Sequence, residues 1–168
     1  RILRIPVVIP ESDMAPGRVT KWSSHFARRI AVSYPELVTY FKAKKTAWTG
    51  QPIREELMKP IKDGAYEYLK LNSDLPVIYI TGGSSGAQKI NDAILEVLPE
   101  LVKKYQIIHQ TGKANFDEVK GIAMLKLHGS PLIENYKVFP FLNALAIKMV
   151  AGVSSLVISR AGSTLFEI

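Results

Sequence analysis

One segment in the second half of the chain constrains the fold more than any other. Residues 77–81 read Val-Ile-Tyr-Ile-Thr, which is typical of a buried strand. Residues 82–87 read Gly-Gly-Ser-Ser-Gly-Ala, which is turn chemistry. From residue 87 to residue 104, apolar side chains recur three or four residues apart, which predicts a helix with one apolar stripe. A buried strand that enters a long helix through glycines indicates an α/β protein.

The same alternation of strand and helix patterns runs along the whole chain. The expected strands are residues 7–9, 30–33, 46–49, 77–81, 106–109, 136–139 and 155–159. The expected helices are about residues 17–28, 35–42, 62–71, 87–104, 115–123 and 143–151. This order predicts mostly parallel sheets with helices on both faces.

A domain boundary is expected where the pattern is interrupted by turn residues. Residues 49–54 read Thr-Gly-Gln-Pro-Ile-Arg, and Pro60 follows. The sequence therefore predicts two α/β units, residues 1–53 and 54–168. Both patterns begin or end abruptly, so each unit is expected to be incomplete and the chain to be a fragment of a larger protein. Paired α/β units bind ligands at the carboxyl ends of their strands.

The charge balance favours anionic partners. Among 168 residues, 22 Lys and Arg stand against 15 Asp and Glu, a net charge of +7. The positive residues are spread along the chain, without the basic run and interleaved aromatics of a nucleic-acid module, so nucleic acid is not an expected partner. The absence of cysteine excludes disulfide scaffolds, zinc ribbons and cysteine nucleophiles. No apolar run approaches the roughly 18 residues of a transmembrane helix.

The glycine-rich turn is a candidate phosphate loop. Gly82, Gly83 and Gly86 would let the backbone approach an anion at a helix N-terminus, although a purely structural turn is the alternative. It is not a P-loop, because no Lys-Ser/Thr pair follows Gly86. A dinucleotide fingerprint would need glycine at Thr81 and an acid at the end of the next strand, so NAD is not expected.

A second turn of this kind lies near the end of the sequence. The strand pattern at residues 155–159 leads to Gly162, and Glu167 follows one turn into an expected helix. A carboxylate there could accept two hydrogen bonds from a ribose diol. The alternative is an acid that only stabilises the helix dipole.

Metal and hydrolase chemistry find no support in the sequence. His25, His109 and His128 are not at metal-ligand spacing, and no Asp-x-Asp motif is present. The glycine turn is out of register with the Gly-x-Ser-x-Gly elbow of serine hydrolases. Neither a metal nor a cofactor is therefore expected.

Taken together, the motifs resemble the MurG family of bacterial glycosyltransferases. The resemblance covers essentially the whole chain and is carried by residues 5–17, 50–54, 82–87, 109–113 and 158–163. It implies a GT-B fold of two Rossmann-like domains, with residues 1–53 ending the acceptor-side domain and residues 54–168 beginning the donor domain. It also implies transfer of N-acetylglucosamine from UDP-N-acetylglucosamine to an undecaprenyl-linked muramyl peptide, at the cytoplasmic face of the membrane.

The resemblance also assigns roles to individual residues. Arg54 and Ser84 would contact the UDP-sugar, the backbone at Leu142 would read uracil, and Glu167 would hold the ribose. Residues 10–13 read Pro-Glu-Ser-Asp where many members have His-Glu-Gln-Asn, a form similar to that of certain Gram-positive members.

An inverting transfer needs a base for the acceptor hydroxyl and positive charge or dipoles for the departing UDP. Helix N-termini and Arg54 would serve the leaving group, and Glu11 and Asp13 are the candidate bases. The family's N-terminal glycine loop and its paired glutamines have no counterpart here, so residues 1–168 alone are expected to be inactive. Two alternatives stay open: another GT-B enzyme, such as a glycolipid synthase, or a non-catalytic donor-binding subunit.

The expected helix at residues 17–28 suggests contact with an anionic membrane. Val19, Trp22 and Phe26 fall on one helical face, and basic residues fall around another. The alternative is that the apolar face packs on the sheet of its own domain.

Overall fold

A computed structural model describes residues 5–83 and 85–162. The predictions for Ser84 and Glu167 fall outside these residues. The chain divides into two compact units, Arg1–Ile53 and Arg54–Ile168, which are described separately. Their assignment to acceptor and donor sides stays a prediction.

Unit 1 is a small parallel sheet with short helical segments. Its strands β1 (Val8–Glu11), β2 (Arg29–Val32) and β3 (Thr46–Trp48) lie in the order β1-β2-β3. They are joined by α1 (Arg18–Ser23) and by the 3-10 segments η1 (Pro35–Tyr40) and η2 (Ala43–Lys45). The buried core consists of Ala27, Ile30, Val32 and Leu37.

The two helices of unit 1 are shorter than the sequence pattern predicts. Instead of residues 17–28, α1 ends at Ser23, where the Ser23 and Ser24 hydroxyls donate to the carbonyls of Val19 and Lys21. Such side-chain bonds compete with the backbone pattern of a helix. The expected helix at residues 35–42 is the 3-10 segment η1, in which the β-branched pair Val38 and Thr39 disfavours the α conformation.

Unit 2 is built on a four-stranded parallel sheet. The strands are β4 (Val77–Thr81), β5 (Gln106–Gln110), β6 (Tyr136–Phe139) and β7 (Ser154–Ser159), in the order β6-β5-β4-β7. Each strand lies within one or two residues of the range expected from its apolar run. The central strands β4 and β5 are buried at every residue, because both of their faces are covered.

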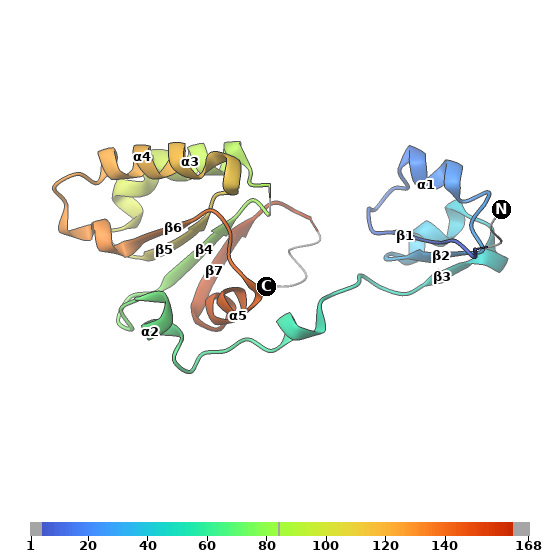
Figure 1. The fold of residues 1–168 in the computed structure, drawn as a ribbon, viewed down its shortest axis with the longest axis horizontal. Coiled ribbons are helices and arrows are strands. Elements are labelled where there is room, and N and C mark those ends of the chain that lie inside the picture. The colour runs from blue at the N-terminus through green and yellow to red at the C-terminus, as the bar shows by residue number, and fades with distance from the viewer. Residues whose placement is uncertain (1–4, 84, 163–168) are drawn as a thin grey trace. The chain divides into compact units, whose positions relative to one another are not determined.

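Helices cover both faces of this sheet, as predicted (Figure 1). One face carries α3 (Gln88–Leu101) and α4 (Phe116–Lys126), and the other carries α2 (Ala65–Leu69) and α5 (Ala144–Val153). Alternate residues of β4 serve the two layers: Ile78 and Ile80 pack with α3 and α4, whereas Val77 and Tyr79 pack with α2 and α5. The 3-10 segments η3 (Glu55–Met58), η4 (Lys113–Asn115) and η5 (Pro131–Asn135) complete the unit.

Two helices of unit 2 are shorter than expected, since α3 ends at Leu101, three residues before the expected end at residue 104. The pattern at residues 62–71 gives only α2, which is bounded by Gly64 and Lys70, both in the left-handed region. A left-handed residue closes a helix because it turns the chain out of the helical path. In contrast, α4 runs three residues beyond the expected end at residue 123.

Candidate functional site

The carboxyl ends of the four unit 2 strands meet at one edge of the sheet. All four strands are parallel, so the loops that follow them gather there. The described residues of these loops are 82–83, 85–87, 111–115, 140–143 and 160–162. We call this edge the carboxyl edge. The glycine turn lies in its middle, because β4 is flanked by β5 and β7.

The glycine turn enters α3 through three backbone positions that suit glycine. Gly82 is buried, and Gly83 and Gly86 have φ values of 81° and 77°. The Gly83 N–H donates to the Thr81 hydroxyl at 3.1 Å, which anchors the turn to the end of β4. Ala87 is the N-cap of α3 and offers no capping side chain. The turn therefore presents the positive end of a helix dipole at the carboxyl edge, which favours an anion.

The turn after β5 packs directly against this glycine turn. Gly112 has a φ of 85°, and a Cβ atom added to it would lie 2.6 Å from the nitrogen of Gly86. A Cβ on Gly86 would collide in turn with the Thr111 carbonyl oxygen. Only two residues without side chains allow this approach, so the backbone of one turn shapes the other.

Gln110, the last residue of β5, links three parts of the carboxyl edge. Its Oε1 accepts from the Leu142 N–H at 3.1 Å and from the Tyr79 hydroxyl at 3.4 Å. Its Nε2 lies 3.4 Å from the Gly83 carbonyl oxygen and 3.4 Å from the Thr81 hydroxyl. One buried amide thus connects the glycine turn to the loop after β6.

A buried network of polar side chains also contacts the carboxyl edge. The Nε2 of His109 contacts Asn91 Oδ1 at 3.0 Å, and its Nδ1 contacts the Tyr136 hydroxyl at 2.9 Å. Asn91 Nδ2 donates to the Thr111 carbonyl oxygen at 3.3 Å. Because Oδ1 can only accept, His109 carries its proton on Nε2 and accepts the Tyr136 proton on Nδ1. Burial lowers the pKa of His109 to about 4, so the ring is neutral near pH 7.

Arg160 brings a permanent positive charge to the carboxyl edge. It follows β7, its side chain is exposed, and its Nε donates to the Gly82 carbonyl oxygen at 2.9 Å. Arg160 and Gln110 were recognised in the sequence only as parts of longer motifs, so their place in the site was not predicted. The available signal was that each polar residue ends or directly follows an apolar strand run.

The predicted donor-site residues differ in their location and in their exposure to solvent. Leu142 is buried at the carboxyl edge, with its N–H held by Gln110. Gly162 is exposed in the loop after β7. Arg54 is exposed at the start of η3, a segment that contacts α5. The roles given to these residues, and to Ser84 and Glu167, stay predictions.

Glu11 and Asp13, the candidate bases in unit 1, differ in their surroundings. The Glu11 carboxylate is buried and accepts from the Gly17 N–H at 3.0 Å and the Asp13 N–H at 3.2 Å. Burial raises the pKa of Glu11, but hydrogen bonds from the Thr20 side chain and the backbone of Asp13, Gly17 and Ser12 outweigh it, so the pKa is lowered. Glu11 therefore holds the loop after β1 as a carboxylate, whereas the Asp13 side chain is exposed.

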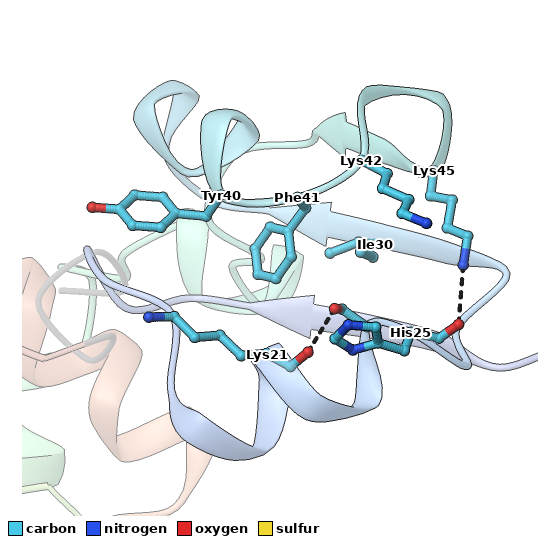
Figure 2. Close-up of a pocket in the computed structure, with 8 residues that line it drawn as sticks. Lys21, His25, Ile30, Tyr40, Phe41, Lys42 and Lys45 are labelled. Carbon is cyan, nitrogen blue, oxygen red and sulfur yellow. Dashed lines mark hydrogen bonds between the residues drawn. The ribbon is translucent and has the colours of Figure 1, made fainter.

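Unit 1 also has a basic pocket of about 400 Å³ (Figure 2). Its lining residues are Lys21, Ser24, His25, Ile30, Tyr40, Phe41, Lys42 and Lys45. Lys45 Nζ donates to the His25 carbonyl oxygen at 3.3 Å, and Lys21 Nζ lies 5.7 Å from the centre of the Tyr40 ring. The pocket thus concentrates positive charge around an apolar floor.

The described residues contain neither a cluster of metal-binding side chains nor a membrane-spanning helix. Within residues 5–83 and 85–162, no group of three or more His, Cys, Asp or Glu side chains could hold a metal ion. No helix in the described part of the chain is both long and apolar enough to span a membrane.

Comparison with known proteins gives consistent matches. The model of the glycosyltransferase family 28 C-terminal domain matches residues 77–168. The UDP-N-acetylglucosamine--N-acetylmuramyl-(pentapeptide) pyrophosphoryl-undecaprenol N-acetylglucosamine transferase 2 of Bacillus cereus is 39% identical over 165 residues, which are 98% of this chain and 44% of that protein. A transferase of the same name from Treponema denticola is 38% identical over 167 residues, 97% of this chain and 42% of that protein.

A solved structure shares the fold. The crystal structure of Acinetobacter baumannii MurG matches with a TM-score of 0.57 and 24% identity, over 99% of this chain and 43% of that chain. The chain therefore spans less than half the length of the proteins that it matches.

Proposed function

The chain belongs to glycosyltransferase family 28, and from this we propose that it is part of an N-acetylglucosamine transferase of peptidoglycan synthesis. The donor would be UDP-N-acetylglucosamine, and the acceptor would be undecaprenyl-diphospho-N-acetylmuramoyl-peptide, the step from lipid I to lipid II. The proposal is supported by the names of relatives that are 38–39% identical over nearly the whole chain.

We propose that the carboxyl edge of unit 2 binds the donor. The main support for this proposal is the position of the glycine turn. It contacts the turn after β5 at Gly112, and Gln110 connects it to the loop after β6. Gly82, Gly83 and Gly86 would face the diphosphate, and the Leu142 backbone would read uracil. Arg54 and Ser84 would contact the UDP-sugar, Gly162 would act with the phosphate-loop glycines, and Glu167 would hold the ribose.

Inverting transfer would place the acceptor hydroxyl in line with the anomeric carbon while UDP departs. Positive potential from the α3 N-terminus and from Arg54 would stabilise the departing diphosphate. Of the two candidate bases, Asp13 fits better than Glu11. A general base must be free to accept a proton, whereas the Glu11 carboxylate has a lowered pKa and already accepts two backbone N–H groups.

Unit 1 would form part of the acceptor side, at the cytoplasmic face of the membrane as a peripheral protein. Val19, Trp22 and Phe26 are 78%, 69% and 60% exposed. In the described residues, therefore, this apolar face does not pack on the sheet. Exposed aromatics beside basic residues suit an anionic lipid surface, where the lipid-linked acceptor resides.

The test is transfer by the protein expressed from its complete reading frame. Labelled UDP-N-acetylglucosamine should yield a product with an undecaprenyl-linked muramyl-peptide acceptor and none with diacylglycerol. The reverse preference would support a glycolipid synthase instead. Binding of UDP without transfer to either acceptor would favour a donor-binding subunit. Residues 1–168 alone should show no turnover.

A further inference from the structure

Gln110 occupies a position that no apolar residue could fill without leaving the Leu142 N–H unpaired. Its side chain is only 4% exposed, and its amide faces the Leu142 N–H on one side and the Gly83 carbonyl oxygen on the other. The first group can only donate and the second can only accept, so the orientation of the amide is set by its partners. Loss of the amide would leave the buried Leu142 N–H without its partner, which is costly, whereas the Gly83 carbonyl oxygen would keep the Gly86 N–H at 3.1 Å.

The two groups held by Gln110 belong to different loops. Gly83 lies in the turn after β4, and Leu142 lies in the loop between β6 and α5, with β5 between the two strands. Gln110 is therefore a bridge over the end of β5.

We infer that Gln110 is a positioning residue that sets the spacing between the diphosphate-binding turn and the uracil-reading loop. The inference rests on the proposed function, since it assumes that the carboxyl edge binds a uridine diphosphate sugar. Gln110 acts through the backbone at Gly83 and Leu142 and needs no contact with the nucleotide itself.

The same strand offers a matched control at its other end. Gln106, the first residue of β5, is also buried, and its amide accepts from the Asn72 N–H at 2.7 Å and donates to the Asn72 carbonyl oxygen at 2.6 Å. Gln106 thus holds the loop at Asn72 at the edge of the sheet where the strands begin, which is opposite the carboxyl edge. Gln106→Met and Gln110→Met remove the same chemistry from the same strand.

The first experiment measures UDP affinity by calorimetry on the protein from its complete reading frame. Both methionine variants should lower the denaturant midpoint of unfolding. Only Gln110→Met should weaken the binding of UDP. We expect its affinity to fall by about tenfold or more, which corresponds to the loss of one buried hydrogen-bond partner. The ratio of UDP to CDP affinity should also fall in Gln110→Met alone, because the loop that reads the base is no longer held.

A second variant separates positioning from general stability. In Gln110→Glu, the ionised carboxylate still accepts from Leu142 but repels the Gly83 carbonyl oxygen. A protonated carboxyl restores the donor, and burial raises the pKa of such a group. The UDP affinity of Gln110→Glu relative to the wild type should therefore rise as the pH falls from about 8 to about 6.

The outcomes are distinguishable. If the wild type binds UDP and Gln110→Met binds it equally well, this inference is wrong and the proposed function stands. Equal losses in Gln106→Met and Gln110→Met would also overturn it, since general stability would then explain both. A wild-type protein that does not bind UDP would overturn the proposed function and this inference together.

Discussion

The backbone nitrogen of Gly86 would lie 2.6 Å from a Cβ atom added at Gly112, so the turns that follow β4 and β5 touch through their main chains. Neither residue is a near neighbour of the other in sequence. The contact exists because β4 and β5 pair in parallel and end at the same edge. Substitutions at either glycine should therefore affect the shape of the whole carboxyl edge.

Gly112→Ala should destabilise the protein more than Gly129→Ala does. Both glycines have positive φ, at 85° and 73°, and Gly112 with ψ 147° lies near a region essentially reserved for glycine, where alanine costs about 1–3 kcal/mol in backbone strain. Nothing lies within 4 Å of a Cβ at Gly129, whereas at Gly112 the Gly86 backbone must move. The expected loss at Gly112 is about 2–4 kcal/mol, measured by denaturant unfolding. Equal losses would show that the two turns do not press on each other.

The free energy of unfolding should decrease as the pH is lowered, over a pH range set by His109. Its pKa is 6.5 in an exposed ring but about 4 in the folded protein, so the unfolded chain takes up the proton first. The stabilisation is complete above pH 6.5 and is lost as the pH falls towards 4, by about 3 kcal/mol. His109→Gln should be less stable at neutral pH but should show a flatter decline over this window. A parallel decline would mean that other groups cause the acid sensitivity.

Arg54→Ala should weaken UDP binding by about 1.5–3 kcal/mol, the range for hydrogen bonds to a charged group. Arg29→Ala, which removes an exposed arginine of unit 1, serves as the control and should leave binding unchanged. Calorimetry on the protein from its complete reading frame gives both values. Equal affinities for Arg54→Ala and the wild type would remove Arg54 from the site.

Charge reversal at Arg18, Lys21 and Arg28 should reduce co-sedimentation with anionic vesicles at low salt. A basic residue near such a surface contributes about 1 kcal/mol, and added salt screens the effect. The matched control reverses three exposed lysines of unit 2: Lys89, Lys104 and Lys120. An equal loss of binding in this control would indicate attraction by net charge alone.

Trp22→Ala and Phe26→Ala should weaken vesicle binding while leaving the unfolding midpoint nearly unchanged. The two rings contact each other, with centroids 5.2 Å apart, and both are largely exposed. Removal of exposed side chains costs little stability. A large drop in the unfolding midpoint would support the alternative, in which this face packs within the protein.

Much of the fold could be predicted because its signals are local. Each strand of unit 2 is a short apolar run, and the stripe of α3 repeats every three to four residues, so both are visible in a short window. The lengths of α1 and α2 were predicted less well. Their ends depend on the hydroxyls of Ser23 and Ser24 and on the left-handed Lys70, which the apolar pattern does not register.

The types and order of residues 77–104 are enough to predict that a glycine turn follows β4 and opens a helix. The groups that surround the turn, in contrast, depend on how distant strands pair. Gln110 reaches Gly83 and Leu142, and Arg160 reaches Gly82, because the strands pair in the order β6-β5-β4-β7. That order arises from hydrogen bonds between segments far apart in the chain, and no local pattern of side chains specifies it.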